Sequence, residues 1–258
     1  MKTSTPTGLC ALFTARLYAN PMDTPKHKAV VLCSGGIDSS TVLAIAHSEQ
    51  LELYCLSFSY GQRHTIELQA AEQIAKAFKA HEHLRLDISL DLIGASALTT
   101  STPVPRRTHA TDVTDDIPVT YVPARNTIFL SYALALAEAR ECSTVFIGVT
   151  AVDYSGYPDC RPEYIEAFQR MADLATRAGV EGHPIKIRTP LISLTKAEII
   201  TMGIKLGVDY SITHSCYDPS PDGAACGTCE SCLLRRNGFE AAGVPDPTRY
   251  AHRPQSQP

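Results

Sequence analysis

Four cysteines near the C-terminal end of the chain have the spacing of a metal site. They follow the pattern Cys-x9-Cys-x2-Cys-x2-Cys and comprise Cys216, Cys226, Cys229 and Cys232. Thiolates about three residues apart on tight turns can reach one tetrahedral Zn²⁺ ion, and Gly223 and Gly227 allow such turns. Because four sulfurs complete the coordination shell, the predicted zinc is structural. Reduced core cysteines would suit a less polar stretch, and an iron–sulfur cluster is left open as an alternative.

A glycine-rich loop near the other end of the chain has the residues of a phosphate-binding site. Ser34-Gly35-Gly36-Ile37-Asp38-Ser39 lies between an apolar segment, 28–33, and a segment of helical periodicity. Adjacent glycines let backbone N–H groups approach an anion closely, and a helix N-terminus adds the positive end of a dipole. The predicted nucleotide-binding residues are Cys33, Ser34, Gly35, Gly36, Ile37, Asp38, Ser39, Ser40, Thr41, Val42 and Leu43.

This loop differs from a Walker A loop, because the lysine of that motif is absent. We therefore predict that it holds the β- and γ-phosphates of ATP as departing pyrophosphate. Asp38 is the predicted partner of a Mg²⁺ ion on those phosphates. The alternative is an ordinary glycine turn between strand and helix, which would not require Ser, Asp and Ser at these offsets.

The loop needs a strand before it and a helix after it, and the rest of the chain continues this alternation. Short β-branched segments at 28–33, 51–60, 82–87, 143–149 and 184–190 are the predicted strands. Segments 39–47, 64–80, 125–140 and 161–178 carry apolar residues at helical spacing. Thr195 and Glu198 form a capping-box sequence for a further helix that runs to about Leu206 and ends at Gly207. This order predicts an α/β fold with a doubly wound parallel sheet and a small C-terminal zinc-binding segment.

Length and charge limit the classes of function. The 258 residues, of which 44% are hydrophobic, suffice for one main domain with a small appendage. A net charge of -4 does not suit a protein that binds a nucleic-acid backbone, so a small-molecule substrate is favoured. No apolar run approaches the roughly 18 residues that span a bilayer. The clustered cysteines indicate a metal site instead of a secreted disulfide framework, and a cytoplasmic location is expected.

Four regions are expected along the chain. Residues 1–25 are an N-terminal extension expected to be disordered, 26–210 form the nucleotide-binding domain, 211–245 the four-cysteine zinc segment and 246–258 a tail. The stretch 93–120 is rich in Thr, Ser, Pro and Asp. It exceeds the roughly 12 to 15 residues usual for a structureless connection, so we expect a lid or a disordered insertion.

The Ser-Gly-Gly-x-Asp-Ser loop resembles that of the PP-loop ATP pyrophosphatases, which cleave ATP to AMP and pyrophosphate while adenylating a substrate oxygen. With further motifs and the cysteine cluster, the chain from 28 to 242 resembles the 7-cyano-7-deazaguanine synthase family. These motifs are Tyr60-Gly61-Gln62-Arg63-His64, Pro123-Ala124-Arg125-Asn126 and the segment from Asp153 to Pro162. Ala124 departs from the family pattern, in which glycine precedes Arg-Asn.

The resemblance implies an ATP-dependent ligase that converts 7-carboxy-7-deazaguanine and ammonia to the nitrile precursor of queuosine. It implies ATP, Mg²⁺ and Zn²⁺ as cofactors. Ligands of an open parallel sheet lie beyond the carboxyl ends of its strands, where the segment after 143–149 is expected. Asp153 and Asp159 are expected to accept N–H groups of a guanine-like base, and Arg125 or Arg161 to hold a carboxylate in a bidentate fork.

Two further sets of residues are expected in addition to the nucleotide-binding set, and Asp38 of the loop belongs to one of them. The substrate-binding set is Arg125, Asn126, Asp153, Tyr157, Asp159 and Arg161, and the catalytic set is Asp38, Lys196 and Arg161. Some of them have structural alternatives. Asp159 could cap the helix that Pro162 begins, Lys196 could be an exposed helix residue, and His64 could be a capping or surface histidine instead of a ligand contact.

The chemistry of a nitrile constrains the mechanism. Both carboxylate oxygens must be removed, and each must first become a better leaving group. Adenylating the acid gives an acyl-AMP that ammonia attacks to form the amide, and adenylating the amide oxygen then lets AMP leave as the nitrile forms. The chain has no room for a glutaminase domain, so free ammonia is the expected nitrogen donor.

Two other functions are left open. A PP-loop tRNA thiolation enzyme would use Cys160 or a Cys-x2-Cys pair as a persulfide carrier, but the acidic charge balance and the zinc spacing argue against it. A non-enzymatic nucleotide-binding or zinc-ribbon module would not need the aspartate and arginine segment. No nucleic-acid or membrane partner is expected, and a homodimer is left open.

Overall fold

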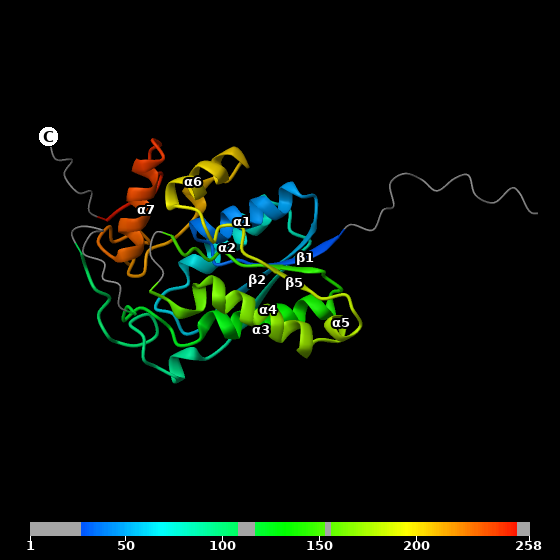
Figure 1. The fold of residues 1–258 in the computed structure, drawn as a ribbon. Helices are drawn as coiled ribbons and strands as arrows, with labels where there is room; N and C mark the ends of the chain where they lie inside the picture. Colours follow the sequence, from blue (N-terminus) through cyan, green and yellow to red (C-terminus); the bar gives the residue numbers. More distant parts are fainter. Residues whose placement is uncertain (1–26, 108–116, 153–155, 252–258) are drawn as a thin grey trace, which may run out of the picture.

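A parallel sheet of five strands runs through the centre of the molecule (Figure 1). The strands are β1 (Lys28–Leu32), β2 (Glu52–Ser59), β3 (Glu82–Asp87), β4 (Thr144–Phe146) and β5 (Lys186–Arg188). Their order is β3-β2-β1-β4-β5, and every neighbouring pair is parallel. The chain therefore builds outward from β1 to β3 and returns to the other side of β1, which confirms the predicted doubly wound sheet.

The computed structural model describes residues 27–107, 117–152 and 156–251. The expected N-terminal extension, 1–25, and the predicted substrate ligand Asp153 lie outside these residues, as does the end of the expected tail, 252–258. Across the described ranges, no helix combines the length and apolar character needed to cross a membrane.

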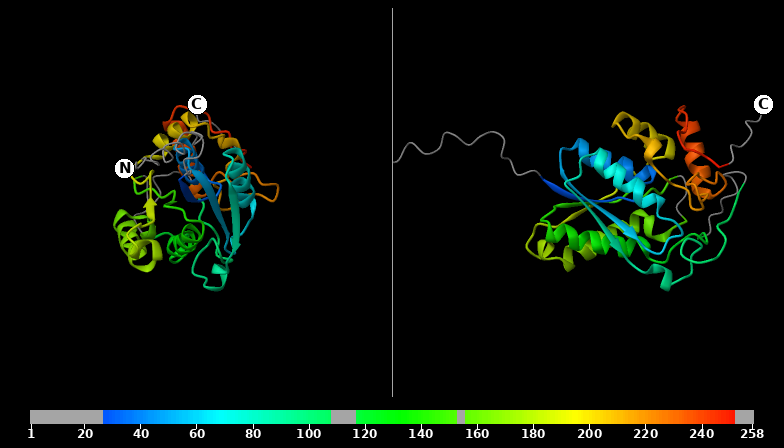
Figure 2. Two further views of the ribbon diagram at one scale, coloured as in Figure 1. Left: turned by 90° about the vertical axis from the view of Figure 1, so that its right-hand side faces the viewer. Right: turned by 180° about the vertical axis from the view of Figure 1, so that it is seen from behind.

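Helices cover both faces of the sheet (Figure 2). One face carries α1 (Ile37–Ser48), α2 (Ile66–Ala77) and α6 (Lys196–Lys205), and α7 (Glu230–Ala241) packs beside α6. The other face carries α3 (Arg125–Ala139), α4 (Pro162–Ala175) and α5 (Arg177–Val180). Short 3-10 turns occur at η1 (Leu90–Leu92), η3 (Pro158–Cys160) and η4 (Tyr210–Ile212).

In strand β1, the residues from Ala29 to Leu32 are all apolar. Successive side chains of a strand point to opposite faces of the sheet. Val30 belongs to the core that includes Leu130 of α3, whereas Val31 belongs to the core that includes Val42 of α1. Because both faces of this central parallel strand are covered, no polar residue alternates with the apolar ones.

Most predicted elements are confirmed, and several are shorter than predicted, including β5, which covers Lys186–Arg188 of the predicted 184–190. β4 covers only part of 143–149, because beyond Phe146 the chain leaves the ladder and lines a pocket. The predicted helix 161–178 divides at Thr176, whose backbone is extended and whose hydroxyl accepts from the Gly179 N–H at the start of α5. The capping box of Thr195 and Glu198 is present at the start of α6.

The described part of the stretch 93–120 packs on the rest of the fold. Leu98 and Val104 are buried. The Arg107 N–H donates to the Thr228 carbonyl oxygen at 2.8 Å, and the Arg63 guanidinium donates to the Thr102 carbonyl oxygen at 2.7 Å. Through these hydrogen bonds, this stretch packs between the segment that follows β2 and the cysteine segment.

Ala124 at the start of α3 has a left-handed backbone, with φ 52° and ψ 25°. This conformation brings Cβ close to the following carbonyl oxygen and costs an L-residue about 1–2 kcal/mol. The Ala124 N–H donates to the Tyr121 hydroxyl at 2.9 Å, which helps to hold the turn. The position is the one at which the family pattern has glycine, and the backbone conformation gives the physical reason for that preference.

Replacing Ala124 with glycine is expected to raise the free energy of unfolding by about 1 kcal/mol, because relief of the left-handed strain exceeds the entropy that glycine adds to the unfolded chain. Ala135 is the matched control, since it is exposed within the same helix. There the same substitution should lower the free energy of unfolding by about 1 kcal/mol. Urea unfolding measures both variants, and destabilisation by both would contradict the strain at Ala124.

Candidate active site

The pocket lies where the strand order of the sheet reverses. β1 and β4 are neighbours, and the chain leaves β1 towards α1 and leaves β4 towards the segment that ends in α4. Such a switch point leaves a crevice beyond the carboxyl ends of the two strands. A pocket of about 310 Å³ occupies this position, lined by the loop after β1 and by Gly148, Val149 and Thr150 after β4.

The glycine-rich loop forms one wall of this pocket. Gly35 has φ 78°, and a Cβ there would collide with the Glu67 carbonyl oxygen and the Ala71 nitrogen of α2. The Ser34 and Ser39 hydroxyls lie 3.0 Å apart, and the Ser34 N–H donates to Ser39 Oγ at 3.2 Å. The loop and the N-terminus of α1 therefore present hydroxyls and backbone N–H groups to the pocket, as a phosphate cradle requires.

Asp38 and Lys196 come together at the loop. Lys196 Nζ lies 2.6 Å from Asp38 Oδ1, and the two side chains are 14% and 28% exposed. Lys196 is the first residue of α6, and the capping box before it holds that end of the helix. Both residues line the pocket. The structure thus brings together two of the three predicted catalytic residues.

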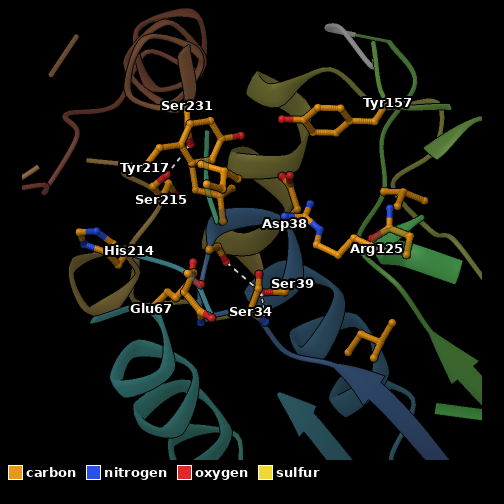
Figure 3. Close-up of a pocket in the computed structure, with 18 of the residues that line it drawn as sticks. Ser34, Asp38, Ser39, Glu67, Arg125, Tyr157, His214, Ser215, Tyr217 and Ser231 are labelled. Atoms are coloured by element: carbon orange, nitrogen blue, oxygen red, sulfur yellow. Dashed lines mark hydrogen bonds between the residues drawn. The ribbon is translucent and has the colours of Figure 1, made fainter. Parts of the chain in front are cut away.

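Arg161, the third predicted catalytic residue, lies elsewhere. It is exposed at the start of α4 and does not line the pocket, whereas Arg125 does. Arg125 lies over the ring of Tyr60, 5.8 Å from its centroid, and its Nη1 is 3.5 Å from the Tyr60 hydroxyl. Arg125 and Arg161 were both predicted as candidates for binding the substrate carboxylate, and only Arg125 lines the pocket. Figure 3 shows it opposite the loop.

Asp159 has a protein partner for its carboxylate. Asp159 Oδ2 accepts the backbone N–H of Asn126 at 2.9 Å, and the Asn126 side-chain amide donates to the Asp159 carbonyl oxygen at 3.0 Å and to Cys160 Sγ at 3.2 Å. The carboxylate therefore caps α3, whose own N-cap residue, Ala124, has no side-chain acceptor. The predicted alternative, a cap of the helix that Pro162 begins, is wrong, because the carboxylate caps α3 and the N-cap residue of α4 is Arg161.

The segment around the first cysteine closes the pocket from a third side. The His214 N–H donates to the Gly35 carbonyl oxygen at 2.9 Å, and Ser231 Oγ donates to the Ser215 carbonyl oxygen at 2.6 Å. His214, Ser215, Ser231 and Tyr217 line the pocket, and Figure 3 shows them facing the loop. Burial lowers the pKa of His214 to about 4, so its ring is neutral at physiological pH. The sequence did not single these residues out, because their place depends on how the cysteine segment docks.

Glu67 is a further pocket residue that the sequence did not single out. It lies in the first turn of α2 and lines the pocket beside the loop. Burial raises the pKa of its carboxyl group to about 7, while attraction to Arg125 and a hydrogen bond with Gln62 act in the opposite direction. Its place in the pocket depends on the docking of α2 beside the loop, which the sequence pattern does not show.

The four cysteines of the predicted metal site converge. All four are buried, and their Sγ atoms lie within 4.8 Å of one another. Cys226 Sγ and Cys232 Sγ are 4.0 Å apart, close to the roughly 3.8 Å expected around one tetrahedral Zn²⁺ ion with Zn–S distances of about 2.3 Å. An iron–sulfur cluster would hold its cysteine sulfurs farther apart, because several irons and sulfides lie between them. The donor set therefore fits one zinc ion.

Cysteine hydrogen bonding supports this fit. The Cys226 N–H donates to Cys216 Sγ at 3.2 Å, and the Cys229 N–H donates to Cys226 Sγ at 3.3 Å. Such N–H groups stabilise thiolates bound to a metal. Gly223 and Gly227 have φ values of 82° and 78°, as the predicted tight turns require.

Replacing Cys229 with alanine is expected to release the zinc and to loosen the pocket wall, because metal binding and local folding are coupled. The purified protein should contain about one zinc per chain, and the variant should lose it and become sensitive to protease near the C-terminal end. Cys142 is the control, since it is a buried thiol outside the cluster. Full zinc content and unchanged protease resistance in the Cys229 variant would contradict the assignment.

Comparisons with known proteins show the family of the chain. The family model described as "Queuosine biosynthesis protein QueC" matches residues 28–243. A curated 7-cyano-7-deazaguanine synthase from Desulfatibacillum aliphaticivorans is 64% identical over 226 residues, which cover 87% of this chain and 97% of the relative. The synthase from Syntrophus aciditrophicus is 62% identical over 225 residues, with coverages of 87% and 97%.

A solved structure of NMN synthetase from Francisella tularensis is 17% identical, with a TM-score of 0.45, and the match covers 86% of this chain and 79% of that one. The family is shown by the sequence comparisons, which confirm the resemblance carried by the loop, the arginine segment and the cysteine cluster. The chain belongs to the QueC family of 7-cyano-7-deazaguanine synthases.

Proposed function

We propose that this chain converts 7-carboxy-7-deazaguanine and ammonia to 7-cyano-7-deazaguanine with the consumption of ATP. The observation that carries the proposal is a single pocket in which a phosphate-binding loop faces a partly buried arginine. Ser34, Asp38 and Ser39 lie on one side and Arg125 on the other (Figure 3). The loop suits the phosphates of ATP, and a guanidinium suits a carboxylate. Family membership supports the identity of the acid.

The phosphates would be held by the loop residues 34–39 and the N-terminus of α1. Asp38 is the residue that would hold a Mg²⁺ ion, which would offset the charge of the pyrophosphate. Lys196 lies at the same carboxylate and would stabilise negative charge that develops on the phosphates. The loop has no Walker lysine, so cleavage between the α- and β-phosphates is the reaction that it suits.

The substrate acid would lie against the opposite wall. Arg125 would orient its carboxylate towards the α-phosphate of ATP, and Tyr157 and Tyr217 would flank the flat base with their rings. Asp159 would position Arg125 without touching the substrate, because its carboxylate caps the helix that begins with Arg125. Arg161 has no assigned contact with the substrate, since its side chain is exposed outside the pocket.

Nitrile formation would take two adenylations in this one site. Adenylation of the acid gives an acyl-AMP, and attack by ammonia gives the amide and AMP. Adenylation of the amide oxygen then gives an imidate that loses AMP and a proton to leave the nitrile. Both activations transfer AMP to an oxygen at the same carbon, so one loop and one arginine can serve both.

The tRNA thiolation alternative has less support from the structure. Cys160 is buried and accepts a hydrogen bond from the Asn126 side chain. The Cys-x2-Cys pairs of 226–232 converge on a single metal position. A persulfide carrier needs an accessible thiol with thiolate character, and neither set offers one.

Incubation with ATP, nitrogen-labelled ammonium and 7-carboxy-7-deazaguanine is expected to yield AMP, pyrophosphate and a nitrile that carries the label. Mass spectrometry should detect the amide as an earlier species. Asp38→Ala should abolish turnover without unfolding the protein, because the carboxylate lies in the first turn of α1 at the pocket surface and is 28% exposed. If ATP labelled at its α-phosphate never gives labelled AMP, or if added amide is not converted to nitrile, the mechanism is wrong.

Arg125→Met is expected to raise the KM for the acid, since a lost charged hydrogen bond costs about 1.5–3 kcal/mol, or roughly 10- to 100-fold. Binding of ATP should be preserved, because the loop is intact. Arg161→Met is the matched comparison, and its KM should stay near that of the wild type. Steady-state kinetics with each substrate varied separately measures both. An effect confined to the Arg161 variant would assign the carboxylate contact to that residue instead.

A further inference from the structure

Glu67 is an acidic side chain at the phosphate loop that the two adenylations do not use. It lies in the first turn of α2, directly beside the loop, since the Glu67 carbonyl oxygen occupies the space next to Gly35. Its side chain is partly buried and lines the pocket. Figure 3 shows it between His214 and Ser34, across the pocket from Arg125. A carboxylate beside an anion-binding loop repels the phosphates, so its presence there indicates a role other than phosphate binding.

The carboxylates that line the pocket differ in their partners. Asp38 is ion-paired with Lys196. Glu67 forms no ion pair within 4.0 Å in the part of the chain that the structure describes, and Gln62 supplies its hydrogen bond. A carboxylate that is partly withdrawn from water, faces a binding pocket and has no described cationic side chain within ion-pair distance suits a small cationic ligand. Tyr60, Leu68 and Leu98 are buried residues that also line this pocket.

We propose that Glu67 binds the incoming ammonium ion and accepts its proton, so that neutral ammonia attacks the acyl-adenylate. This inference rests on the proposed function, in which nitrogen comes from free ammonia. Near neutral pH that ammonia is mostly ammonium, which has no lone pair and cannot attack a carbonyl carbon. A group inside the pocket must therefore both attract the cation and deprotonate it.

The environment of Glu67 suits both tasks. Its negative charge attracts ammonium, and its position beside the loop holds that cation in the same pocket in which the acyl-AMP would form. Burial raises the pKa of Glu67 to about 7, and a general base is most effective when its pKa is near the working pH. An exposed glutamate would be a weaker base.

The proposed step balances in atoms and charge. One proton passes from ammonium to the Glu67 carboxylate, and the freed lone pair forms the C–N bond at the acyl carbon. The C–O bond to AMP breaks, and AMP leaves with the electron pair. The positively charged nitrogen loses its second proton to water, and Glu67 returns its proton to water before the next cycle. The second adenylation uses the nitrogen already bound in the amide, so no ammonium is taken up there.

Glu67→Gln tests the proposal, because it keeps the size of the side chain and removes the base. The expected result is a loss of roughly 10²- to 10⁴-fold in kcat/KM for ammonium during amide formation. Conversion of added amide to nitrile should stay close to the wild-type rate. Hydroxylamine gives a second readout, since it is largely neutral near pH 7 and needs no deprotonation. The variant should form the hydroxamate from acid and ATP nearly as fast as the wild type.

Glu72→Gln is the matched control, since Glu72 lies on the same helix and is exposed outside the pocket. Its dependence on ammonium should be unchanged. Equal loss of amide, hydroxamate and nitrile formation in Glu67→Gln would overturn the proposal, because it would place Glu67 in ATP binding or in folding. An unchanged dependence on ammonium would overturn it as well. Failure of the wild-type protein to form amide would instead contradict the proposed function.

Glu67→Asp covers the case in which the glutamine variant does not fold. It keeps a carboxylate but withdraws it by one methylene group. Amide formation should then fall while hydroxamate formation is retained, and the loss should be smaller than complete removal of the base would cause. If the aspartate variant loses both products equally, the proposed role of Glu67 is wrong.

Discussion

The site depends on the close approach of three backbone segments around the phosphate loop. At Gly35 the loop lies against the first turn of α2 with no space for a side chain. At Gly148, after β4, an added Cβ would lie 3.0 Å from the Asp38 carbonyl carbon and the Ser39 nitrogen. The His214 N–H holds the third segment to the Gly35 carbonyl oxygen. These contacts hold the loop in one shape before ATP arrives, which lowers the entropy lost on binding.

The same contacts tie the metal segment to the catalytic pocket. His214 and Ser215 directly precede the first cysteine, and Ser231 lies between the last two. Arg235 of α7 is 2% exposed in its side chain and is held by Asp246, Thr213 and the Tyr210 carbonyl oxygen. A zinc ion bound by the cysteines would therefore stabilise a wall of the pocket without touching the substrate. This accounts for a closed four-thiolate site in an enzyme whose chemistry needs no zinc-bound water.

The opposite wall depends on a different interaction. Asp159 caps α3 from another segment, and the left-handed Ala124 turns the chain so that the helix begins at Arg125. The guanidinium is thereby held on the rigid end of a helix, over the ring of Tyr60. A carboxylate bound there would face the loop, and the distance between the two partners would be set by the sheet beneath them. Glu67 completes the arrangement on the loop side, where the nitrogen would enter.

Much of the fold could be predicted because its signals are local. The apolar runs, the capping box of Thr195 and Glu198 and the turn at Gly207 each involve residues within one strand or one helical turn, so the sequence by itself determined the order of elements, the loop and the cysteine set. It also determined the family. These features do not depend on which segment packs beside which.

The partners of the pocket side chains were decided by tertiary structure. Asp159 and Asn126 are 33 positions apart, and the sequence around Asp159 suggested a cap of the helix that Pro162 begins, not of α3. Arg125 and Arg161 are both at the start of helices, and only the docking of α3 and α4 on the sheet buries one and exposes the other. The raised pKa of Glu67 likewise comes from burial against the loop. Burial depends on contacts between segments distant in the chain, and periodicity within a segment carries no information about those contacts.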